Sequence, residues 1–167
     1  MQELKEPNAL APFNCYSALA IEDSLENVVQ LIRFNNQRSE GFELFEFSRN
    51  NQLTSKGTFF DGKNNFPAIK SNFGYVENNS SIWLPSPGGL IRFNPNRPQD
   101  YELKKIQVAG KSVLFRDLEV WGERYFWLTS RTNGLLLYDK FQDSIVRQIK
   151  YFHVGNQTIE INNIYLG

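Results

Sequence analysis

The stretch that decides the fold reads SIWLPSPGGLIRF at residues 81–93, and a second stretch, YFWLTSRTNGLLLYD at residues 125–139, repeats its pattern. In both stretches an apolar run with a tryptophan is followed by a glycine-containing turn and by a second apolar run. Trp83 and Trp127 lie 44 positions apart. Self-similarity at a period of about 20–50 residues is typical of proteins built from repeated structural units.

A weaker copy precedes these two units. Residues 30–33 read QLIR, with Ile32 in the place of the tryptophan, and residues 41–47 read GFELFEF after a longer connection. In each of the three units an apolar run begins 15 positions before the isoleucine or tryptophan, at Ser17, Ala68 and Ser112. Each unit is followed by a stretch with the two-residue alternation of a β-strand, at residues 52–59, 101–106 and 145–151. Each unit therefore predicts four short antiparallel strands.

Units of about 44 residues with four strands have the size and strand count of a β-propeller blade. The sequence predicts an all-β fold with three blades, at about residues 17–60, 67–107 and 111–152, and the start of a fourth at 156–167. The tryptophans are expected in the core between blades, because stacked sheets cover each other's faces. Propellers typically have about four to eight blades. We therefore expect a partial propeller, completed by the rest of a larger propeller or by another copy of the chain.

The units at residues 82–95 and 126–139 resemble the two-component regulator propeller repeat, in which isoleucine and tryptophan precede a glycine turn and a Gly-Leu pair. Residues 161–165, INNIY, resemble the opening strand of that repeat. The first unit departs from the pattern because it lacks the tryptophan, and LPSP at residues 84–87 replaces the usual small residues. The resemblance implies the ligand-sensing propeller of a bacterial hybrid histidine kinase. Such a periplasmic region binds a small polar ligand, such as an oligosaccharide, and signals to a kinase outside this chain.

Composition excludes several classes of function. The 167 residues include 18 Lys and Arg and 18 Asp and Glu, so the net charge is zero, which argues against a whole-domain grip on nucleic acid or on an anionic membrane. One cysteine, Cys15, cannot form an internal disulfide, and together with the single histidine, His153, it cannot build the usual zinc site. Acidic Glu3 and Glu6 stand where a signal peptide would be basic. We expect any targeting sequence to lie outside this chain.

No pattern of a catalytic nucleophile or cofactor site stands out, so the sequence predicts no enzyme and no cofactor. Asp117 and Glu119 lie two positions apart on a predicted strand and therefore share a face. Such a pair can act in general acid and base catalysis, as in glycosidases. We expect the pair to be solvated or to face the central channel.

The candidate ligand site comes from the geometry of a propeller. In that fold the loops between the second and third strands and the loops between units share one end of the channel. Polar and charged side chains converging there suit a small polyhydroxylated or anionic ligand. The candidate ligand-binding residues in these loops are Arg38, Lys63, Lys111, Arg131, Asn133 and His153. The alternative for each of them, His153 included, is a solvated loop residue without a binding role.

Two other functions stay open. One is a protein–protein scaffold, which exposed apolar patches would favour. The other is an enzyme built on a propeller, such as a glycosidase or a lyase, which would need an acid pair or a His/Tyr/Arg cluster at the channel mouth. Trp121 is predicted in the turn between the first two strands of the third unit, at the opposite end, as a packing residue or a partner contact.

Overall fold

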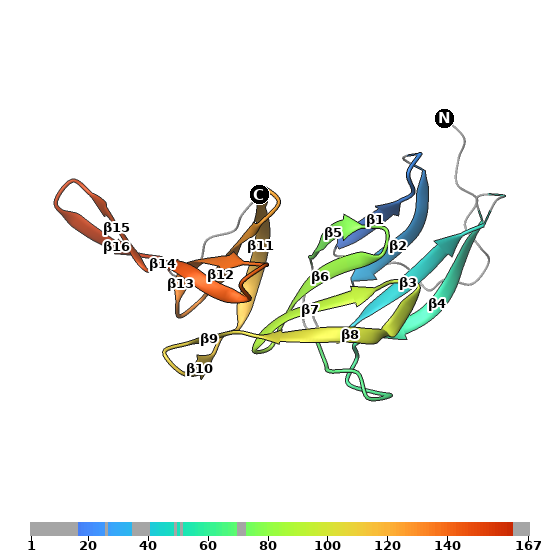
Figure 1. Ribbon diagram of the computed structural model, residues 1–167, viewed down its shortest axis with the longest axis horizontal. Helices are drawn as coiled ribbons and strands as arrows, with labels where there is room; N and C mark the ends of the chain where they lie inside the picture. Colours follow the sequence, from blue (N-terminus) through green and yellow to red (C-terminus); the bar gives the residue numbers. More distant parts are fainter. Residues whose placement is uncertain are drawn as a thin grey trace.

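The computed structural model describes residues 17–25, 27–34, 41–48, 50, 52–69 and 73–161. Every regular element in these residues is a β-strand. Twelve of the strands form three four-stranded antiparallel sheets, and four form two small hairpins (Figure 1). In each sheet the strands lie side by side in chain order. The prediction of an all-β fold made of four-stranded antiparallel units is confirmed.

Sheet 1 contains β1 (Ser17–Glu22), β2 (Val28–Phe34), β3 (Phe42–Phe47) and β4 (Leu53–Phe59). Sheet 2 contains β5 (Tyr75–Asn78), β6 (Ser81–Ser86), β7 (Gly89–Asn94) and β8 (Arg97–Lys105). Sheet 3 contains β11 (Phe115–Trp121), β12 (Tyr125–Ser130), β13 (Gly134–Asp139) and β14 (Ser144–Ile149). The hairpins pair β9 (Gln107–Val108) with β10 (Lys111–Ser112) and β15 (Tyr151–Val154) with β16 (Gln157–Glu160).

The strand register makes Ile32, Trp83 and Trp127 equivalent, because each pairs with the first and third strands of its own sheet. Ile32 is buried in the apolar cluster between sheets 1 and 2. Trp83 is buried in the cluster between sheets 2 and 3. The prediction that the second-strand tryptophan is a core residue is confirmed for Trp83, while Trp127 is only half-buried.

Each sheet uses its two faces differently. In sheet 2, Phe93 points back to sheet 1 and stacks on Phe42 with ring centroids 5.3 Å apart. Trp83 points forward and meets Phe126 of sheet 3 edge to face at 5.2 Å. Successive residues of a strand point to opposite faces, so one strand can serve both clusters. Sheets 1, 2 and 3 are therefore joined into a stack by two separate apolar cores.

The predicted first strand of the second unit is wrong. It was expected at residues 67–69, but β5 lies at Tyr75–Asn78. Residues 60–69 instead form a loop, in which Ala68 bridges Asp61 and the Ile69 N–H donates to the Phe60 carbonyl at 2.9 Å. The constant 15-residue spacing misled because the first two strands pair at different separations. Leu19 lies opposite Ile32, 13 positions before it, whereas Tyr75 lies only 8 positions before its partner Trp83. The spacing fails in the third unit too, where Ser112 lies in β10 and the first strand of the sheet, β11, begins at Phe115.

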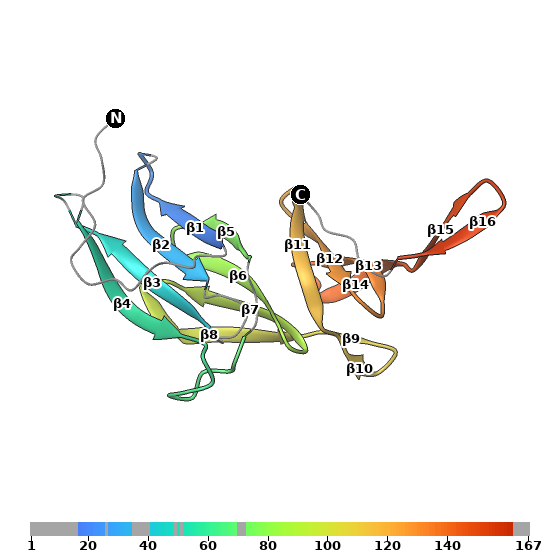
Figure 2. The ribbon, with the colours of Figure 1, turned by 180° about the vertical axis from the view of Figure 1, so that it is seen from behind.

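After each fourth strand the chain makes an excursion from the stack and returns. The excursions are the loop at residues 61–68, the hairpin β9–β10 and the hairpin β15–β16. The first and third are closed at the base by a backbone hydrogen bond of 2.9 Å, from Ile69 to Phe60 and from Ile161 to Lys150. The second begins at buried Ile106 and ends at buried Val113. Figures 1 and 2 show β15–β16 projecting away from the sheets.

The third excursion corrects the prediction of a fourth blade beginning at residue 156. Residues 157–160 pair with residues 151–154 in a two-stranded hairpin. The turn between them contains Gly155 with φ of 59°, a left-handed conformation that glycine adopts without steric cost. Residues 162–167 lie outside the described part of the chain. The stack of three sheets fits a propeller-like fold, and the described residues form no closed ring of sheets.

Candidate functional site

The predicted ligand residues occupy the excursions and one turn. Lys63 lies in the first excursion, where its side chain is 78% exposed and 3.5 Å from the Asp61 carboxylate. Lys111 is exposed in β10. His153 is exposed in β15, with its Nδ1 3.1 Å from the Thr158 hydroxyl.

Arg131 and Asn133 lie in the turn between β12 and β13. Arg131 is exposed, and the Asn133 amide donates to the Thr132 hydroxyl at 3.0 Å. The sixth predicted residue, Arg38, lies outside the described residues. The excursions that carry Lys63, Lys111 and His153 lie apart in both views (Figures 1 and 2). None of these five residues lines the polar groove on sheet 2.

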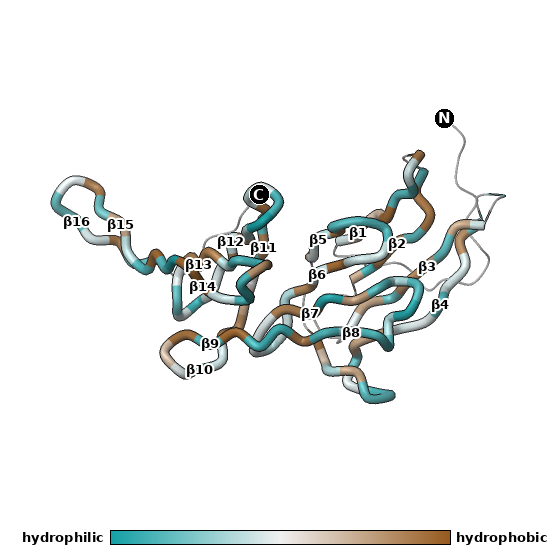
Figure 3. Tube along the Cα trace, in the orientation of Figure 1, coloured by the Kyte–Doolittle hydropathy of each residue, from teal (hydrophilic) through white to brown (hydrophobic). Residues whose placement is uncertain are grey.

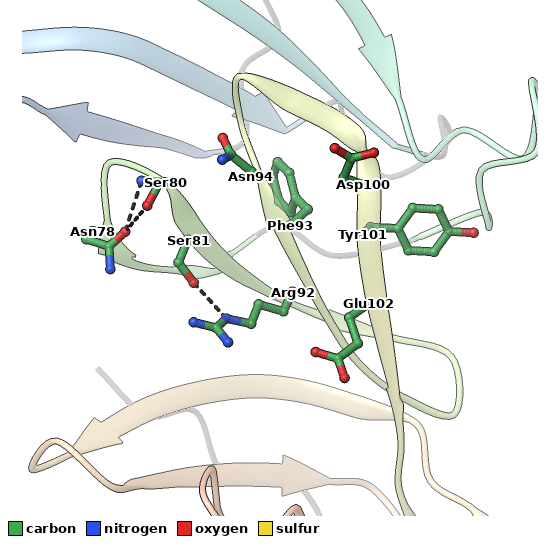
Figure 4. A pocket seen from close by; sticks show the side chains of 9 residues that line it. All are labelled: Asn78, Ser80, Ser81, Arg92, Phe93, Asn94, Asp100, Tyr101 and Glu102. Atoms are coloured by element: carbon green, nitrogen blue, oxygen red, sulfur yellow. Dashed lines mark hydrogen bonds between the residues drawn. The ribbon is translucent and has the colours of Figure 1, made fainter.

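A groove of about 490 Å³ lies on sheet 2, where the β5–β6 turn comes close to β7 and β8 (Figure 4). Its lining supplies amide, hydroxyl and carboxylate groups and one guanidinium. The lining residues are Asn78, Ser80, Ser81, Arg92, Phe93, Asn94, Asp100, Tyr101 and Glu102. No pattern in the sequence indicated this site. The asparagines at its turns can be seen in the sequence, but the strand pairing that brings them to one groove cannot.

Asparagine side chains order both turns at this end of sheet 2. The Asn78 Oδ1 accepts hydrogen bonds from the Ser80 backbone N–H at 3.0 Å and from the Ser80 hydroxyl at 2.8 Å. The Asn94 Oδ1 accepts a bond from the Asn96 N–H at 2.9 Å. Asparagine favours turns because its side chain can bond the backbone two residues later. The same residues therefore build the turns and line the groove.

Arg92 is the cation of the groove. Its Nε donates to the Ser81 hydroxyl at 2.8 Å, as Figure 4 shows, and its guanidinium lies 5.2 Å above the Trp83 ring. A further N–H donates to the Glu77 carboxylate at 3.1 Å. These contacts fix the guanidinium plane and use two of its five N–H donors. Nearly half of the side chain stays exposed, so a ligand in the groove can reach it.

The acidic wall of the groove comes from β8. Asp100 and Glu102 lie two positions apart, and each carboxylate has a cationic neighbour. Arg97 lies 3.5 Å from Asp100, and Lys104 lies 2.6 Å from Glu102. Lys104 also reaches Asp143 of sheet 3 at 3.2 Å. The hydrogen bond with Glu102 and the bond with Asp143 raise the pKa of Lys104, although burial opposes this rise.

Behind the groove, Glu77 joins sheets 2 and 3. Its carboxylate accepts hydrogen bonds from the Ser81 hydroxyl at 2.9 Å and from the Trp83 indole N–H at 3.1 Å. The ammonium of Lys140, from the β13–β14 turn, donates to it at 2.8 Å. Burial disfavours the charged carboxylate, but the hydrogen bonds from Lys140, Trp83 and Ser81 outweigh it and lower the pKa of Glu77 to about 2.

This network predicts a stability that depends on pH. Because the pKa of folded Glu77 is below its ordinary value of 4.5, the ionised group stabilises the fold above that pH, and the gain is lost as the pH falls toward 2. We expect Glu77→Gln to lower the free energy of unfolding by about 2 kcal/mol at neutral pH, since Lys140 loses its carboxylate partner and a hydrogen bond to a charged group contributes about 1.5–3 kcal/mol. Urea unfolding of both proteins should show this difference shrinking between about pH 5 and pH 2.

A matched control is Glu46→Gln. Glu46 pairs with Lys56 at 2.9 Å, but both side chains are about half exposed. Such surface pairs contribute about 0–1 kcal/mol. A wild-type advantage over Glu77→Gln that stays constant from neutral pH to pH 2 would contradict the assignment.

Asp117, Glu119 and Trp121, which the sequence also singled out, all lie in β11. Asp117 is buried and Glu119 exposed, so the predicted acid pair is not solvated as a unit. The prediction that Trp121 lies in a turn is wrong, because it is the last residue of β11 and pairs with Tyr125. Trp121 is 53% exposed, yet its ring stacks on Trp127 at 5.5 Å. It is therefore both an exposed residue and a packing residue.

Neither a known protein family nor a curated protein matches this chain. In the described ranges, no three His, Cys, Asp or Glu side chains come together as a possible metal site. The same residues contain no helix with the length and hydrophobicity needed to cross a membrane.

Proposed function

We propose that the chain is a segment of a β-propeller that recognises a small polar ligand, such as an oligosaccharide, as the periplasmic sensing part of a bacterial two-component receptor. In this proposal it has no catalytic activity, and the signal passes to a kinase outside the chain. The observation that carries the proposal is a stack of sheets with equivalent residues in register and a polar groove in the middle sheet. The likeness of residues 82–95 and 126–139 to the two-component propeller repeat supports the signalling role.

The composition of the groove supports the ligand class. Sugar hydroxyls both donate and accept hydrogen bonds, and the groove supplies amides at Asn78 and Asn94, carboxylates at Asp100 and Glu102, and the guanidinium of Arg92. Phe93 is buried in the core between sheets 1 and 2, and the Tyr101 ring packs against Phe60 at 5.3 Å. The aromatic rings therefore offer little apolar surface, which favours a hydrophilic ligand over an apolar one.

A scaffold role is the second candidate. Large apolar side chains are exposed in sheet 3 and in the last hairpin, including Trp121, Phe141, Tyr151 and Val154. Exposed apolar patches often mark protein interaction sites. This surface lies on other elements than the groove, so the two roles can be tested separately.

The ligand proposal is tested by titrating the isotope-labelled chain with neutral and acidic oligosaccharides while amide chemical shifts are followed. We expect shifts at Asn78, Ser80, Arg92 and the β8 strand. Arg92→Gln should weaken binding at least about tenfold, since a hydrogen bond to a charged group contributes about 1.5–3 kcal/mol. The control Arg147→Gln removes an exposed arginine of sheet 3 and should bind as the wild type does.

Three results would count against the proposal. Shifts confined to the loops of Lys63, Lys111 and His153 would move the site to the excursions. A panel that produces no shifts would reject oligosaccharides as the ligand class. Cleaved sugar in the same samples, detected by chromatography, would replace the sensor by a glycosidase that uses the Asp100 and Glu102 carboxylates.

A further inference from the structure

Sheet 3 has one face that no other described sheet covers. The equivalent faces of sheets 1 and 2 are buried at Ile32 and Trp83 by the next sheet in the stack. On sheet 3 the equivalent Trp127 is half-buried, and Trp121 beside it is 53% exposed. The two indoles stack with an interplanar angle of 22°, and Tyr125 adjoins Trp121 at 6.0 Å. We call this surface the open face; it consists of Glu119, Trp121, Tyr125, Trp127, Leu137 and Arg147.

The last hairpin also exposes apolar side chains. The first excursion reaches the next sheet through Phe66, whose ring lies 5.9 Å from that of Tyr101 in β8. The second does so through Val108, which packs against the core between sheets 2 and 3. The third has exposed Phe152, Val154 and Ile159 instead. Figure 3 shows hydrophobic residues along this projecting hairpin, which has no sheet beneath it among the described residues. The first two excursions thus each contact the next sheet in the stack, and the third has no such sheet to contact among the described residues.

The other end of the stack offers a complementary shape. On the outer face of sheet 1, Ala18 and Ala20 are exposed in β1, and Leu31 beside them is half-buried. The register makes these alanines equivalent to Leu118 and Val120 of sheet 3, which pack into the core. β1 therefore has small side chains where β11 has large ones, while Arg33 and Glu43 form an ion pair elsewhere on the same face of sheet 1. The two alanines leave room for indole rings over β1.

We propose that the open face of sheet 3 binds the outer face of sheet 1 in a second copy of the chain, head to tail. In this interface Trp121 and Trp127 lie over Ala18, Ala20 and Leu31 of the partner copy. It continues the two internal sheet-on-sheet interfaces with the same strand order. The inference rests on the proposed propeller architecture and does not depend on the ligand.

The head-to-tail arrangement has a consequence for the size of the assembly. Contacts of this type form closed rings when the rotation between copies permits closure. The described residues of two copies would supply six sheets, three from each, which lies within the range of about four to eight blades typical of propellers.

Cysteine cross-linking tests the geometry in a Cys15→Ser background. Chains carrying Leu31→Cys and chains carrying Glu119→Cys are purified separately, mixed and oxidised; Glu119 is exposed and lies beside Trp127 on the open face. We expect a disulfide between the two kinds of chain, identified by mass spectrometry of the linked peptides. The matched control mixes Lys63→Cys with Glu119→Cys, which places one thiol on an exposed loop away from the interface and should give no specific product.

Light scattering of the unmodified chain over a concentration series tests the association itself. We expect a concentration-dependent dimer, and Trp127→Ser should weaken the association at least about tenfold, because tryptophans often dominate interface energies. A thermal melt of Trp127→Ser checks that the monomer remains folded. A chain that stays monomeric at its highest soluble concentration would overturn the inference. A disulfide that forms within the Glu119→Cys protein alone would also overturn it, since it places two open faces against each other.

The two proposals fail in different ways. A monomer that still binds oligosaccharide in the groove would remove the dimer and leave the proposed ligand function intact. A cross-linked dimer that binds no member of the sugar panel would support the dimer and reject the proposed ligand class.

Discussion

Replacing Trp83 with alanine is expected to lower the free energy of unfolding by about 3–5 kcal/mol. The indole is 2% exposed and lies between sheets 2 and 3, edge to face with Phe126 at 5.2 Å. Its removal leaves a cavity in the core that joins the two sheets. It also removes the indole N–H that Glu77 accepts at 3.1 Å. Urea unfolding followed by circular dichroism measures the loss.

The control for this prediction is Trp121→Ala. It removes the same side chain from a site where 53% of the surface is exposed, so it should cost about 1 kcal/mol or less. Equal losses for the two variants would mean that Trp83 is not a core residue. They would also remove the basis for treating the repeated tryptophan as the element that joins one sheet to the next.

The second large effect is expected at Gly134, where Gly134→Ala should cost about 3 kcal/mol or more. This glycine begins β13 with φ of 71°, a conformation that costs other residues about 1–2 kcal/mol. A β-carbon there would also collide with the Ile149 carbonyl oxygen and lie 3.0 Å from the Lys150 Cα. Crowding of this kind typically adds about 1–3 kcal/mol, because the backbone must move. Chemical unfolding at neutral pH gives the comparison.

Gly110→Ala separates the two contributions. Gly110 has a similar φ of 74°, but nothing lies within 4 Å of the position a β-carbon would take. This variant should therefore show only the conformational cost of about 1–2 kcal/mol. If both variants lose the same stability, the close approach of the turn to the end of β14 does not matter.

The sheets were predictable because they are local. Each four-stranded unit forms from consecutive segments, so alternation of apolar residues and turn residues such as those at 133–134 are enough to reveal it. The burial of Trp83 was also predictable, since a sheet with two apolar faces must be covered on both. The exact place of β5 was not, because the separation between paired positions of the first two strands differs from sheet to sheet, 13 residues for Leu19 and Ile32 but 8 for Tyr75 and Trp83.

The candidate site was less predictable than the fold. The six predicted residues were chosen because loops at one end of a propeller share a channel mouth. The groove instead lies where Asn78 and Arg92 of sheet 2 meet Glu102, which is 24 positions from the first of them along the chain. Their neighbourhood depends on strand pairing and on side-chain direction. A single sequence reports both only indirectly.

The amino-acid sequence by itself determined that this chain forms repeated four-stranded antiparallel units, because strand alternation and turn chemistry act over a few residues. Only the tertiary structure decided which faces are covered. It buries Trp83 between two sheets and leaves Trp127, at the same place in the repeat, half open to solvent. It also brings the Lys140 ammonium to Glu77 across 63 positions of chain. These differences arise because burial depends on what packs above a residue, whereas the repeat specifies only the residue itself.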